Sequence, residues 1–127
     1  MAGKAIPDNL RRYLLASSLT VPHVEAILLL RHDPQTSWSA QALASRLYLP
    51  DRRARQLLDE LVEMRIAASA DAQQFAYRPQ NAELASLLDL LAAAYASQLV
   101  EVTRLIHTAA SPAAEQFAEA FRFRKDD

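Results

Sequence analysis

The hydrophobic pattern between Trp38 and Pro79 changes its period, and this change constrains the fold more than any other feature of the chain. Up to Arg65, apolar residues recur every three or four positions, which is the spacing of amphipathic helices. Leu49-Pro50-Asp51 interrupts this spacing as a tight turn, because proline suits the first turn of a following helix. Beyond Arg65, two short runs alternate loosely around a polar turn, which is typical of a brief β-hairpin. The stretch therefore predicts two helices joined by a turn and followed by a hairpin.

Helices are also predicted on both sides of this stretch. Before it, Asp8 to Ser17 and a segment from Thr20 to Asp33 carry helical apolar spacing with capping residues at their starts. After it, one long helix is expected from residue 82 to about 108. A single Gly in 127 residues, with abundant Ala and Leu, favours helix throughout. The expected fold class is therefore mainly α.

The long helix carries an apolar stripe of about seven turns at roughly 3.6 residues per turn. So small a domain cannot cover a stripe of this length, and pairing with a second copy of the chain would bury it. We therefore expect a homodimer, with these dimerisation residues: Leu84, Leu88, Leu91, Tyr95, Leu99, Val102 and Ile106.

Composition excludes several kinds of catalytic and cofactor site. The only Gly lies at position 3, so no glycine-rich loop is available to bind phosphate or a dinucleotide. There is no Cys, and the three His are scattered, so we expect neither a metal nor a thiol nucleophile. The serines are better explained as helix caps than as nucleophiles. We expect a protein with no enzymatic activity and no cofactor.

Charge and hydropathy bear on partners and location. The net charge is −1, made up of +2 over residues 1–19, zero over 20–80 and −3 over 81–127. A nucleic-acid surface would therefore need local clustering of basic side chains. No signal peptide is visible, and the longest apolar run, Ala26–Leu30, is too short to span a membrane. We expect a soluble cytoplasmic protein that does not contact a membrane.

Residues 20–108 resemble the winged-helix domains of small bacterial transcription regulators of the MarR and PadR families. The likeness rests on the order of elements and on the W-S-A-x-x-L-A helix start at Trp38. It implies a winged-helix domain over residues 1–80, a helical dimerisation arm over 81–127 and double-stranded DNA as the partner. The chain departs from the usual pattern twice. Met64-Arg65-Ile66 stands where many such domains carry Gly, and the hairpin tip holds Asp71 and two Gln.

In this resemblance, the segment from about 50 to 65 is the recognition helix, whose first turns meet base edges. Its first turns are cationic and lie opposite the apolar stripe of the same helix. Arg can bind guanine and Gln can bind adenine through paired hydrogen bonds. Arg53 would reach a phosphate, and Arg46 and Arg78 would add backbone contacts. The candidate DNA-binding residues are Arg52, Arg53, Arg55, Gln56, Arg46 and Arg78.

The same residues allow a second interpretation. Arg55 lies four residues before Asp59, and Arg52 four before Gln56, so these side chains can pair along their own helix. Asp59, Glu60 and Glu63 would also repel phosphate along the second half of the helix. The alternative is a protein–protein interaction module that keeps the winged-helix scaffold without binding DNA.

Overall fold

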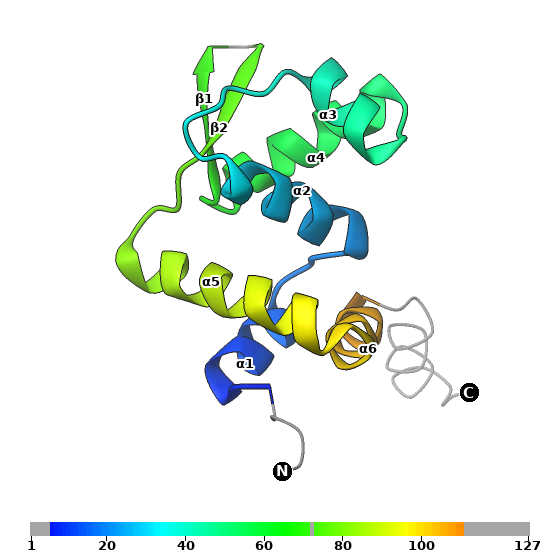
Figure 1. Ribbon diagram of the computed structural model, residues 1–127, viewed down its shortest axis with the longest axis vertical. Coiled ribbons are helices and arrows are strands. Elements are labelled where there is room, and N and C mark those ends of the chain that lie inside the picture. The colour runs from blue at the N-terminus through cyan, green and yellow to red at the C-terminus, as the bar shows by residue number, and fades with distance from the viewer. Residues whose placement is uncertain (1–5, 72, 111–127) are drawn as a thin grey trace, which may run out of the picture. The chain divides into compact units, whose positions relative to one another are not determined.

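The computed structural model of the chain describes residues 6–71 and 73–110 (Figure 1). Helices dominate these residues, and the expected mainly helical class is confirmed. Residues 111–127 of the predicted arm lie outside the described part. The elements are α1 (Asp8–Ala16), α2 (Val21–His32), α3 (Ala40–Leu47), α4 (Asp51–Glu63), β1 (Ala67–Asp71), β2 (Gln74–Tyr77), α5 (Ala82–Ser97) and α6 (Leu99–Ala110).

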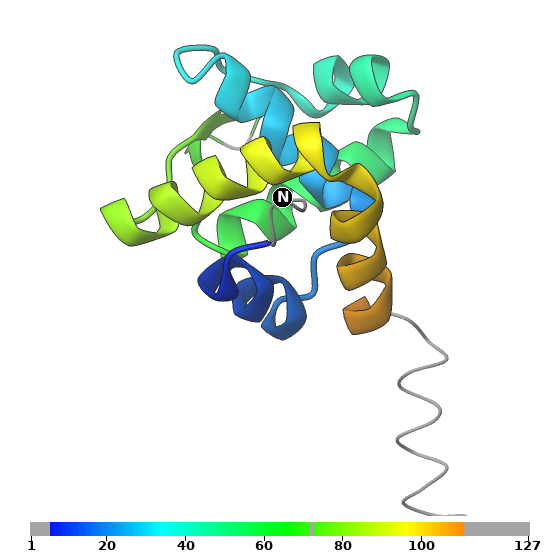
Figure 2. The same cartoon turned by 60° about the horizontal axis from the view of Figure 1, so that its bottom comes forward.

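The chain divides into two compact units. Val21–Leu88 form one unit, and the described residues 6–20 and 89–110 belong to the other. The sequence grouped α1 with the residues up to 80. In the structure α1 instead packs against α6 (Figure 2), because their apolar faces cover each other.

Helices α3 and α4 form as their sequences predict. The Ser39 hydroxyl caps α3 by accepting a hydrogen bond of 3.0 Å from the Ala42 amide. Pro50 precedes α4 and accepts its first backbone hydrogen bond, from Ala54. The predicted apolar face of α4 is confirmed, since all of its members are fully buried: Ala54, Leu57, Leu58 and Leu61.

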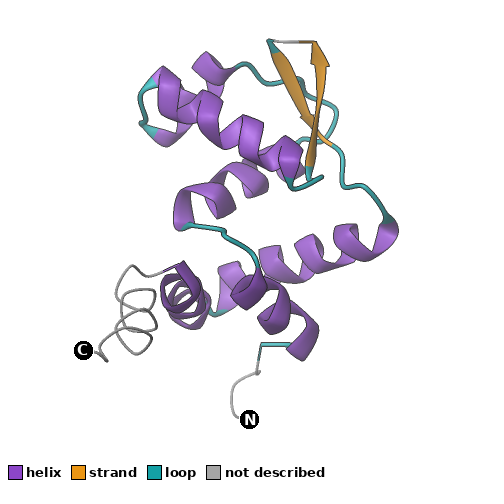
Figure 3. Cartoon of the chain, turned by 180° about the vertical axis from the view of Figure 1, so that it is seen from behind, coloured by secondary structure: helices purple, strands orange, loops and turns teal. Residues whose placement is uncertain are grey.

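The predicted hairpin is present as two antiparallel strands (Figure 3). Asp71 stands opposite Gln74 in the register, and the Asp71 side chain accepts a hydrogen bond of 2.7 Å from the Gln73 amide. A side chain thus stabilises a turn that has no Gly. Phe75 also pairs with Trp38, and their backbones exchange hydrogen bonds of 2.7 and 2.8 Å. The segment before α3 is therefore tied to β2.

Among the described residues, two that are not glycine adopt the left-handed conformation. Tyr48 ends α3 at φ 58° and ψ 47°, and Arg65 follows α4 at φ 67°. After α4, the Arg65 amide donates to the Val62 carbonyl and the Ile66 amide to the Leu61 carbonyl. The missing Gly at Met64-Arg65-Ile66 is thus a departure in sequence but not in backbone conformation.

The prediction of one long helix over residues 82–108 is wrong. α5 and α6 are separate helices whose axes bend by 119° across Gln98. The Gln98 amide donates to the Ala94 carbonyl, while its own carbonyl accepts from the Val102 amide, so it ends one helix and begins the next. The Ser97 hydroxyl also donates to the Ala93 carbonyl at 2.8 Å, a contact that bends helices.

The bend allows one chain to cover most of its own apolar stripe. Leu88, Leu91, Val102 and Ile106 are buried, Leu84 and Tyr95 are partly buried, and Leu99 is 49% exposed. The homodimer was expected because so small a domain cannot bury the whole stripe of one long helix. That reason no longer holds, and the dimer stays a prediction.

Within residues 6–71 and 73–110, no single helix is long and apolar enough to cross a membrane. The bent pair α5–α6 reaches the threshold by length and composition alone.

Candidate functional site

The first turns of α4 carry three of the predicted cations, Arg52, Arg53 and Arg55. Arg52 is exposed and has no hydrogen bond or ion pair within the described residues. Gln56 is also exposed, and its Oε1 accepts a hydrogen bond of 3.0 Å from Arg53 Nη1. The alternative interpretation paired Gln56 with Arg52. In the structure Gln56 pairs instead with Arg53, three positions before it. Arg52 remains available to a partner.

Arg55 is committed to its own unit. Its Nε lies 3.1 Å from Asp59 Oδ1 and 3.3 Å from Oδ2, which is the intrahelical pair that the alternative interpretation anticipated. The guanidinium also lies 5.5 Å from the centre of the buried Phe75 ring. Both contacts hold the side chain against the hairpin. Arg55 therefore fits the role of a positioning residue better than that of a base reader.

Arg46 makes a similar contact on α3. Its guanidinium lies 5.7 Å from the centre of the Trp38 ring, within the range of a cation–π interaction. Trp38 is buried, and its indole Nε1 finds no acceptor among the described residues. Trp38 and Phe75 form one β-bridge through their backbones. The guanidinium of Arg46 lies over the Trp38 ring and that of Arg55 over the Phe75 ring, so each residue of the bridge is covered by one cation. The last predicted cation, Arg78, follows β2 and is exposed.

The acidic second half of α4 is partly engaged inside the unit. Asp59 pairs with Arg55, as above. Glu60 Oε1 lies 2.6 Å from Nε2 of His23, a buried histidine on α2. Of the three carboxylates that would repel a phosphate chain, only Glu63 is exposed and has no hydrogen-bond or ion-pair partner among the described residues.

Sequence reasoning missed Tyr48, which lies in the turn between α3 and α4. This side chain is 93% exposed, far more than the other large hydrophobic residues of the described structure. The apolar spacing of α3 does not predict this exposure, because a residue at a helix end can point inward or outward. The signal that could have found it is a Tyr directly after a helix and before Leu49-Pro50, where Gly is usual.

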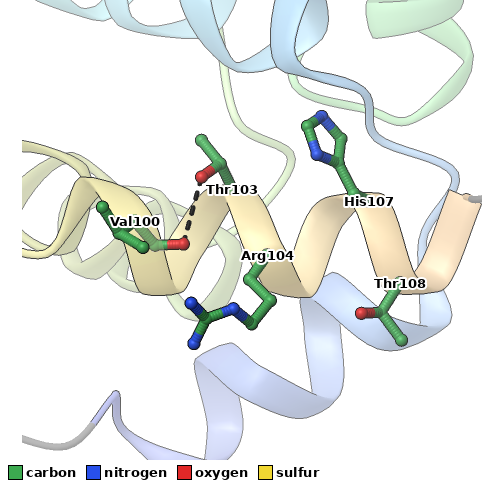
Figure 4. A pocket seen from close by; sticks show the side chains of 5 residues that line it. All are labelled: Val100, Thr103, Arg104, His107 and Thr108. Atoms are coloured by element: carbon green, nitrogen blue, oxygen red, sulfur yellow. Dashed lines mark hydrogen bonds between the residues drawn. The ribbon is translucent and has the colours of Figure 1, made fainter.

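The hollows on the described surface include the following two. One, of about 440 Å³, is lined by these described residues, all from α6: Val100, Thr103, Arg104, His107 and Thr108 (Figure 4). The Thr103 hydroxyl there already bonds the Val100 and Leu99 carbonyls, and we assign no site to this hollow. The second, the α2–α3 hollow, has a volume of about 560 Å³ and is lined by Glu25, Leu28, Leu29, His32, Arg46, Leu47 and Tyr48.

Metal binding has no basis in the described residues. No group of three or more His, Asp or Glu side chains among residues 6–71 and 73–110 lies close enough to hold an ion. No protein-family model, curated protein or solved structure matches this chain. The function has to be argued from the chain's own residues.

Proposed function

We propose that this protein is a sequence-specific DNA-binding regulator of transcription in which Val21–Leu88 act as a winged helix and α4 is the recognition helix. The order of elements supports this. A helix, a strand-like bridge, a helix, a turn, a third helix and a hairpin follow one another, and the bridge at Trp38 pairs with the second strand. In such a layout the third helix lies in the major groove and the hairpin flanks it.

The observation that carries the proposal is the exposed, unpaired Arg52 on a helix whose opposite face is fully buried. A buried face fixes the rotation of α4, so the direction of Arg52 is fixed as well. Its guanidinium fork matches the two acceptors of guanine. The exposed Gln56, one helical turn later, keeps its amide NH₂ for an adenine acceptor while Arg53 holds its oxygen.

The test measures binding to a pool of randomised duplexes as a function of salt. The parent protein should bind, and its affinity should fall steeply between about 50 and 200 mM salt, because cationic side chains displace counterions from DNA. Arg52→Ala should weaken binding to selected sequences by roughly 5- to 100-fold and relax the preference for one base. Arg12→Ala, an exposed cation on α1 in the other unit, is the matched control and should change little.

Absence of salt-dependent binding by the parent protein would refute the proposal. Equal effects of Arg52→Ala and Arg12→Ala would also count against it, since they would show only a general response to lost charge. Selection of binding sites with the parent and with Arg52→Ala would then show whether a preferred base is lost.

The α2–α3 hollow favours a second candidate, a winged-helix module that binds another protein. Its lining includes three leucines, Leu28, Leu29 and Leu47, and the described residues of the hairpin strands carry only the acidic Asp71 as a charged side chain. A partner that purifies in stoichiometric amounts, together with absent DNA binding, would support this candidate. DNA binding with no such partner would refute it.

A further inference from the structure

The turn between α3 and α4 (Figure 1) holds Tyr48 in a conformation that tyrosine disfavours. The Tyr48 and Leu49 amides both donate to the Ala44 carbonyl, and these bonds keep Tyr48 in the left-handed region. Glycine adopts this region freely, whereas a side chain with Cβ is strained there. Backbone conformation therefore gives no reason for a tyrosine at this position.

Packing gives no reason either. The side chain is 93% exposed, so the ring buries almost no apolar area. The hydroxyl has no hydrogen-bond partner in the described structure. A residue that costs conformational energy and returns no burial points to a role outside the folding of the chain.

The neighbours of Tyr48 indicate what that role is. Asp51 begins α4 three residues later, which places the two Cα atoms within about 11 Å of each other. The exposed Arg52 follows Asp51, and the exposed Arg46 lies two residues before Tyr48. In the sequence, Tyr48 thus lies between two cationic residues and three residues before the start of the helix that we assign to DNA.

We propose that the Tyr48 hydroxyl donates a hydrogen bond to a backbone phosphate of DNA and so fixes how the first turn of α4 lies in the groove. This inference rests on the proposed function. Tyrosine is one of the side chains that make such phosphate contacts, which position a protein without reading sequence. Because the phenol is uncharged, it displaces no counterion, and its contact adds nothing to the salt slope.

The experiment compares Tyr48→Phe and Tyr48→Gly with the parent protein, using the labelled randomised duplex pool and thermal unfolding. Tyr48→Phe removes only the hydroxyl and should weaken binding about tenfold with an unchanged salt slope. Tyr48→Gly removes the strain as well, so it should raise the melting temperature while weakening binding at least as much. Tyr13→Phe on α1 is the matched control and should leave DNA affinity unchanged.

The outcomes separate this inference from the proposed function. If the parent protein binds no DNA, both fail. If the parent binds and Tyr48→Phe binds equally well, only the phosphate contact is refuted, whatever Tyr48→Gly does. A lower melting temperature for Tyr48→Gly would show that the ring stabilises the fold, and would also refute it. Weaker binding together with a lowered salt slope would show that the substitution moved cationic side chains away from DNA. This result would also refute the phosphate contact of the uncharged hydroxyl.

Discussion

Replacing Ile106 by Ala tests whether the apolar stripe of α5 and α6 is an internal core or a surface for a second copy. Ile106 is 1% exposed, and α6 packs against α1. Truncation of a buried isoleucine to alanine removes its transfer free energy and leaves a cavity, at a cost of about 2–5 kcal/mol. Leu99→Ala is the matched control. Leu99 is 49% exposed, so its truncation should cost only about 1 kcal/mol.

The measurement is urea unfolding of the parent and both variants at two protein concentrations. With a slope of about 1–3 kcal/mol per molar urea, Ile106→Ala should lower the midpoint by about 1 M or more. The difference in urea midpoint between this variant and the parent should be the same at both protein concentrations, because the lost contacts lie within one chain. A stripe that binds a second copy would behave differently, since loss of the interface depends on concentration.

The reasoning is refuted if Leu99→Ala costs as much as Ile106→Ala. It is also refuted if the effect of Ile106→Ala changes with protein concentration. Either result would support the prediction from sequence that the stripe is a dimer interface.

Two further predictions concern the strained turn after α4 and the titration of Tyr13. Arg65→Gly should raise the free energy of unfolding by about 1 kcal/mol, because glycine adopts the positive φ of this position without strain; an unchanged or lower melting temperature would contradict this. Burial raises the pKa of Tyr13, so the stability it contributes is complete below its ordinary pKa of about 10 and is lost as the pH rises through the higher folded value. The melting temperatures of the parent and of Tyr13→Phe should therefore differ by a constant amount below about pH 10. Above this pH the parent should lose more stability than the variant, so the difference should change. A difference that stays constant at all pH values would contradict the raised pKa of Tyr13.

The region of α3 and α4 was predictable because its signals are local. The Ser39 cap, the Pro50 start and the buried spacing of Ala54, Leu57, Leu58 and Leu61 each depend on residues within one or two turns. The hairpin strands followed from the change of period for the same reason. These features required no knowledge of what lies far away in the chain.

The contacts of the candidate site were only partly predictable. The spacing of Arg55 and Asp59 anticipated their ion pair, since both lie on one helix. No sequence pattern anticipated that Arg55 also covers Phe75, or that Glu60 meets His23 from α2. Such contacts join residues distant in sequence, and only folding brings them together.

The sequence by itself determined the helical class, the turn between α3 and α4 and the cationic first turns of α4, because capping, helical spacing and charge are properties of short segments. Only the tertiary structure decided that α5 and α6 are separate helices, that the chain covers most of its own apolar stripe, and that Tyr48 stands exposed in a left-handed turn. An apolar stripe shows that a face must be covered, but not by what. Beyond the bend at Gln98, α6 packs against α1, and that contact exists only once the chain has folded.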